Sequence, residues 1–126
     1  MVSPLVTAHA DHQRIAAGLR ALIGQRQRLV TTNLVVAETH ALVLRRAGHT
    51  AALAFVRGVE DPPNLVVRSS AELEMQARHD WLERYVDQAL SLTDAVSFAV
   101  MREREIEYAL TLDRHFVVAG FHSLVP

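Results

Sequence analysis

Apolar and polar residues recur along this chain at spacings that predict several amphipathic helices. Apolar positions at helical spacing run through residues 8–24, and Gly24 ends that run. Asn33 is expected to cap a second helix, because its side chain can accept a hydrogen bond from a free amide of the first turn. This helix is expected to stop near Gly48, since glycine tolerates the left-handed backbone found at helix ends.

The same kind of spacing predicts three further helices. Thr50 is expected to cap the first of them, and the Pro62-Pro63 pair terminates it because proline has no backbone N–H to continue a helix. Residues 70–86 form a segment whose apolar side chains lie mostly on one side. Residues 92–105 form the last predicted helix.

Four short β-prone runs separate these helices, at residues 29–32, 65–68, 108–112 and 123–125. Strands that alternate with helices imply a parallel sheet covered on both faces. The pattern therefore predicts an α/β domain of three layers, α/β/α, with a short and mainly parallel sheet. The usual first strand of such a domain is expected to be lacking, because the chain opens almost directly into a helix.

Length and composition narrow the class of protein. The chain has 126 residues, which fits a single domain spanning 1–126, and half of them are apolar. Thirteen basic and fourteen acidic residues give a net charge of −1, which argues against nucleic-acid binding driven by bulk charge. Cysteine is absent, which excludes a thiolate nucleophile and zinc ribbons. No bilayer-spanning run or secretory signal is evident, so a soluble cytoplasmic protein without membrane contact is expected.

Glu38 is the first of three carboxylates that stand near predicted strand ends. It lies about a turn and a half inside an otherwise apolar helical segment. A lone buried carboxylate there is costly unless it is paired or binds a metal ion. The alternative is a glutamate at the edge of the core that pairs with Arg45 or Arg46. The sequence alone leaves both interpretations open.

Asp94 and Asp113 are the other two carboxylates. Ser91-x-x-Asp94 before an apolar run fits a capping box, yet Asp94 shares its helix face with Phe98 and Met101. Asp113 follows a predicted strand directly, and it could equally cap the segment that comes next. Taken singly, each of the two has a structural explanation.

Together, Glu38, Asp94 and Asp113 are expected at one edge of the sheet, because ligands gather at the carboxyl ends of parallel strands. Like charges held close repel each other unless a cation lies between them. Hard oxygen ligands without cysteine favour Mg²⁺ or Mn²⁺ over zinc. Such ions activate water and stabilise the charge that develops on a phosphodiester. The three acids therefore imply metal-dependent phosphodiester hydrolysis.

Three stretches of the chain, 30–39, 85–101 and 109–121, resemble PIN-domain ribonucleases, especially VapC-type toxins of type II toxin–antitoxin pairs. The similarity runs from about residue 8 to the C-terminus. It implies a PIN-like domain and an endoribonuclease that hydrolyses RNA phosphodiester bonds. It also implies that the protein forms a homodimer and that a cognate antitoxin protein inhibits its activity.

The resemblance also assigns roles to particular residues. It implies that Glu38, Asp94 and Asp113 correspond to three acidic residues of the family's Mg²⁺ or Mn²⁺ site. Thr93, which precedes Asp94, would be a supporting hydroxyl. RNA cleavage would then depend on these carboxylates and on the ion they hold.

The chain departs from the family at its N-terminus. PIN domains begin with a strand that ends in an aspartate, which supplies the first metal-binding carboxylate. That segment is missing here, and Asp11 is a poor substitute because it falls at the start of a helix. The chain is therefore expected to be N-terminally truncated relative to the family. Its native start would lie upstream, or it would be a catalytically impaired remnant that binds an antitoxin or RNA without cutting.

A non-enzymatic function is the main alternative. The helices within 34–60 carry much apolar surface, which could serve a dimer or an antitoxin groove: Leu34, Val35, Leu42, Leu44, Leu53 and Phe55. The simpler interpretation is that most of these side chains pack against the sheet.

The sequence does not identify the RNA that would be cleaved, and transfer, ribosomal and messenger RNA are all candidates.

Overall fold

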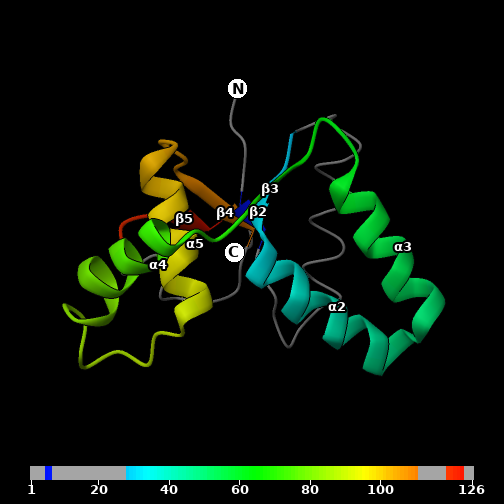
Figure 1. Cartoon of the computed structure of the whole chain (residues 1–126), viewed down its shortest axis with the longest axis horizontal. Coiled ribbons are helices and arrows are strands. Elements are labelled where there is room, and N and C mark those ends of the chain that lie inside the picture. Colours follow the sequence, from blue (N-terminus) through cyan, green and yellow to red (C-terminus); the bar gives the residue numbers. More distant parts are fainter. Residues whose placement is uncertain (1–4, 7–27, 111–118, 124–126) are drawn as a thin grey trace.

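In the computed structural model, residues 5–6, 28–110 and 119–123 are described, and helices lie on both sides of a central sheet (Figure 1). The strands are β1 (Leu5–Val6), β2 (Val30–Thr32), β3 (Leu65–Val67), β4 (Tyr108–Leu110) and β5 (His122–Ser123). They form one sheet in the order β3-β2-β1-β4-β5, and every neighbouring pair is parallel. The predicted parallel α/β architecture is confirmed.

The prediction that the first strand is lacking is wrong. Strand β1 lies at the centre of the sheet, where Leu5 is in register with Val30 on one side and with Ala109 on the other. Strand β1 pairs with β2 and β4 through backbone N–H and C=O groups, which any residue carries. Its two residues can therefore form a central strand whatever their side chains are. The residue after β1 is Thr7 rather than an aspartate. Asp11 and the predicted helix 8–24 lie outside the described residues.

Helix α2 (Asn33–Ala47) begins one residue earlier than expected. Its cap is Thr32, whose Oγ1 accepts a hydrogen bond from the amide of Val35 at 3.2 Å. The prediction of Asn33 as the cap is therefore wrong, since Asn33 is already helical. Gly48 ends the helix as predicted, with a φ of 90° that favours glycine.

Helix α3 (His49–Glu60) follows Gly48 directly, so Thr50 lies inside the helix and the predicted cap at Thr50 is wrong. The helix ends just before Pro62, as predicted. Helices α2 and α3 pack against each other and form a hairpin that extends away from the sheet (Figure 1).

The other side of the sheet carries α4 (Ala71–Ala77), the π-helical turn η1 (Arg78–Leu82) and α5 (Leu92–Glu103). The predicted helix 70–86 is thus shorter and ends in η1. No helix among the described residues is long and apolar enough to span a bilayer.

The core is centred on α5. Phe98 is fully buried, and its ring centroid lies 5.8 Å from those of both Trp81 and Phe121. The other residues of α5 from Ala95 to Met101 are buried as well. Because α5 is enclosed in this way, the residues at its first turn are held in a fixed position.

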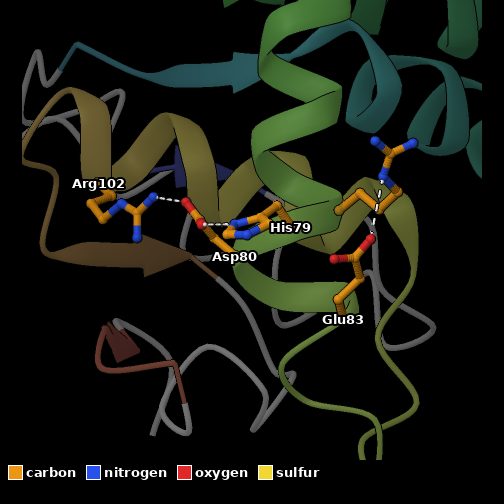
Figure 2. A network of polar contacts seen from close by, with 5 residues as sticks. His79, Asp80, Glu83 and Arg102 are labelled. Atoms are coloured by element: carbon orange, nitrogen blue, oxygen red, sulfur yellow. Dashed lines mark hydrogen bonds and ion pairs between the residues drawn. The ribbon is translucent and has the colours of Figure 1, made fainter.

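A polar network joins η1 to the far end of α5 (Figure 2). Asp80 accepts hydrogen bonds from His79, at 2.9 Å, and from Arg102. The Arg102 guanidinium also lies 4.5 Å from the centre of the Trp81 ring, in cation–π geometry. The hydrogen bonds from His79 and Arg102 hold the pKa of the Asp80 carboxyl below its usual value.

This network predicts that Asp80 contributes to stability at neutral pH and that this contribution is lost in acid. A carboxyl group whose pKa is lowered by folding stabilises the protein at neutral pH, and that stabilisation is lost as the pH falls through the lowered pKa. The Tm of wild type should therefore fall more between pH 7 and pH 3 than the Tm of Asp80→Asn. Glu83→Gln is the matched control, because Glu83 pairs with Arg78 in an exposed ion pair that contributes little. Equal Tm losses for wild type and Asp80→Asn would contradict the prediction.

Candidate functional site

The side chains of Glu38 and Thr93 are in contact, although the two residues are 55 positions apart in the sequence. The Thr93 hydroxyl, in the first turn of α5, donates a hydrogen bond to Glu38 Oε1 at 3.0 Å. Glu38 lies on α2, which begins directly after β2. The bond therefore joins helices from opposite sides of the sheet and fixes one oxygen of the Glu38 carboxylate.

Asp94 follows Thr93 and lies half-buried in the same turn of α5. Its backbone amide donates a hydrogen bond to Ser91 Oγ at 3.1 Å, so Ser91 is the cap of the helix, as predicted. The cap uses the amide of Asp94, so capping and a role for its carboxylate are compatible. A carboxylate in the first turn is also favoured by the helix dipole.

The structure thus places Glu38 in contact with Thr93, and Asp94 follows Thr93 in the same turn of α5. These are three of the four predicted site residues. Asp113 lies outside the described residues. The interpretation of Glu38 as a buried carboxylate is wrong, because its side chain is exposed beside α5. Since water reaches this carboxylate, the cost of burial does not constrain it, and the hydrogen bond from Thr93 is what sets its position.

The oxygen donors at this site fit a hard divalent cation. Two carboxylates and a hydroxyl are the ligand types that Mg²⁺ and Mn²⁺ prefer. A carboxylate has about four acceptor positions, so Glu38 retains capacity for a cation after it accepts the bond from Thr93. Within residues 28–110 and 119–123, no three acidic, histidine or cysteine side chains cluster closely enough to hold a metal ion. Asp113 is the predicted third carboxylate.

Two buried hydroxyl groups close to these residues in the sequence were missed by the sequence analysis. Ser97, one turn after Thr93, and Thr39, next to Glu38, have buried Oγ atoms without a hydrogen-bond partner among the described residues. Ser97 is fully buried within α5. The interruption of the apolar run Ala95–Met101 by this single serine was the available signal.

Comparison with known proteins identifies the class. Residues 3–121 match the PIN domain, so the chain belongs to the PIN-domain family. The chain is 40% identical over 98 residues to the 23S rRNA-specific endonuclease VapC20 of Mycobacterium tuberculosis, in strains H37Rv and CDC 1551. The match covers 78% of this chain and 74% of the relative. These matches confirm the predicted resemblance to VapC-type ribonucleases.

The fold comparison agrees with the sequence comparison. The crystal structure of Mycobacterium tuberculosis VapC20, described as a sarcin–ricin loop cleaving toxin, superposes with a TM-score of 0.80 at 32% identity. The superposition covers 98% of this chain and 100% of that chain. The predicted α/β PIN-like fold and the assignment as a nuclease are both confirmed.

The hydrogen bond from Thr93 to Glu38 predicts a positioning effect on RNA cleavage. Thr93→Val removes the hydroxyl with little change in shape, and it should lower kcat/KM by about 10- to 100-fold, as loss of a group that orients a metal ligand does. Thr93→Ser keeps the donor and should retain most of the activity. The measurement is initial cleavage rate against Mn²⁺ concentration, where Thr93→Val should need more metal. Equal rates for Thr93→Val and wild type would show that the bond is not used.

Proposed function

We propose that this chain is a divalent-metal-dependent endoribonuclease of the toxin–antitoxin kind that cleaves 23S ribosomal RNA in the sarcin–ricin loop. The choice of RNA is supported by the identity to a relative with that specificity. The observation that carries the catalytic part is the bond between Thr93 and Glu38, which brings a carboxylate of α2 to the turn of α5 that holds Asp94.

Glu38, Asp94 and Asp113 would hold Mg²⁺ or Mn²⁺ in this proposal. Such an ion, when bound, lowers the pKa of water and offsets the charge that develops on the phosphodiester. The side chains of this chain set the geometry: Thr93 fixes the orientation of Glu38, and the buried α5 keeps Asp94 in place. The reaction is hydrolysis, in which water attacks phosphorus and one P–O bond of the backbone breaks.

The test compares two RNA hairpins of equal length and composition, one with the sarcin–ricin loop and one with that loop scrambled. Purified protein should cut the first within the loop in Mn²⁺ or Mg²⁺, cut the scrambled hairpin at least about tenfold more slowly, and cut neither in EDTA. Equal cleavage of both hairpins would refute the proposed specificity. Absence of cleavage by folded protein, with RNA binding retained, would support the alternative of a catalytically impaired binding module.

We also propose two protein partners, a cognate antitoxin and a second copy of this chain. The α2–α3 hairpin supports this, because it extends from the body of the protein and Leu44 near its tip is 42% exposed. Val35 and Ala52 are the buried residues within the two helices. The expectation that most apolar side chains of this hairpin pack in the core is thus only partly met.

The proposed substrate also implies a location in the cell. A nuclease for ribosomal RNA would act in the cytoplasm, where ribosomes are.

A further inference from the structure

The turn after β3 leaves the sheet beside the start of α2. Val67, the last residue of β3, is in register with Thr32, the last residue of β2. Asn33 then accepts a hydrogen bond from the backbone amide of Ser69 at 2.7 Å, through its Oδ1. The Ser69 hydroxyl in turn donates to Glu74 Oε2 at 2.7 Å. The backbone between β3 and α4 is therefore fixed at the carboxyl edge of the sheet.

Arg68 is the first residue of this fixed turn, and its side chain is exposed. No carboxylate of the described residues forms an ion pair with it. Two other arginines differ in this respect, because Arg78 pairs with Glu83 and Arg102 pairs with Asp80. The turn thus presents a guanidinium charge to solvent at the edge of the sheet, on a backbone that is already ordered.

This edge is also the one next to the candidate site. Helix α2 begins at Asn33, and Glu38 lies five residues further on, which is about 7.5 Å along the helix axis. Carboxylates at the site repel the phosphates of an approaching RNA strand, and a nearby cation offsets that repulsion. Arginine is well suited to binding phosphate, because its planar guanidinium group can donate two parallel hydrogen bonds to one phosphate group.

We propose that Arg68 binds a backbone phosphate of the RNA substrate next to the scissile phosphodiester and so positions the strand over Glu38 and Asp94. The inference rests on the proposed ribonuclease function, and it adds a substrate-binding residue outside the carboxylate site. Since Arg68 would contact the backbone and not a base, it would contribute to affinity on every RNA sequence.

The experiment measures binding of the fluorescent sarcin–ricin hairpin by anisotropy, without metal and in the Asp94→Asn background, so that no cleavage occurs. Arg68→Ala should raise Kd by about tenfold, and it should reduce the slope of log K against log salt by about 0.7 to 0.9, the value for one lost phosphate contact. Arg68→Lys should recover part of the affinity. Arg57→Ala is the matched control, because Arg57 is an exposed arginine on α3, within the hairpin.

A second readout separates this inference from the function on which it rests. In the protein with Asp94 intact, Arg68→Ala should raise KM with kcat within about threefold of wild type. Wild-type Kd and salt slope for Arg68→Ala, or an equal loss for Arg57→Ala, would overturn the inference while RNA cleavage still stands. If the wild type binds RNA through Arg68 but cuts neither hairpin, the proposed function fails and the phosphate contact stands.

Discussion

Asp94→Asn is expected to reduce cleavage of the sarcin–ricin hairpin by about 10³-fold, which is a loss of roughly 4 kcal/mol of transition-state stabilisation. The substitution removes one negative charge from the first turn of α5 and keeps the size of the side chain. The helix cap should survive, because Ser91 accepts from the backbone amide of Asp94 and not from its carboxylate. The measurement is the single-turnover rate in saturating Mn²⁺, together with a thermal melt that should change little.

Two further variants make this prediction specific. Glu38→Gln should lose activity to a similar extent, because it removes the other described carboxylate of the site. Asp87→Asn is the control, since Asp87 is an exposed aspartate outside the site. Cleavage by Asp94→Asn at a rate near that of wild type would show that the carboxylate is a structural element of the helix end and has no part in catalysis.

Phe98→Ala is expected to cause the largest loss of stability, about 3 to 5 kcal/mol. Phe98 is fully buried between Trp81 and Phe121, so truncation removes apolar contacts and leaves a cavity in the core. A domain of this kind is stable by about 5 to 15 kcal/mol in total, so the variant should be largely unfolded at moderate denaturant concentrations. Urea unfolding followed by circular dichroism would measure the change.

Phe98→Leu should be less destabilising, because leucine refills part of the cavity. Val86→Ala is the surface control, since Val86 is 83% exposed and its truncation should change stability by less than about 0.5 kcal/mol. A loss for Phe98→Ala as small as that for Val86→Ala would mean that the aromatic cluster does not organise the core.

Much of the fold could be predicted because chain-breaking residues mark the ends of long periodic segments. Gly48 ends α2 and Pro62 follows the end of α3, and both of these stops follow from local backbone chemistry. Strand β1 could not be predicted, because two residues carry no periodicity and their position depends on partners far away in the chain. The π-helical turn Arg78–Leu82 has no local sequence signal either.

The candidate site was predictable to a similar extent. Glu38 and Asp94 could be identified because acids near strand ends are expected at one edge of a parallel sheet. The contact between Thr93 and Glu38 could not be derived, since it depends on how α2 and α5 are placed in three dimensions. Arg68 had no signal in the sequence, because it was the last residue of the predicted strand 65–68, and its proposed role rests on the fixed turn around it.

The central position of β1 has a consequence for the order of folding. Leu5 is synthesised before both of its partners, and one of them, Ala109, comes more than a hundred residues later. Contacts this distant in sequence form slowly, because a long loop must close before they contribute any stability. During synthesis the sheet cannot close until β4 has left the ribosome, so the nascent chain completes the pairing of β1 only after more than a hundred further residues have been added.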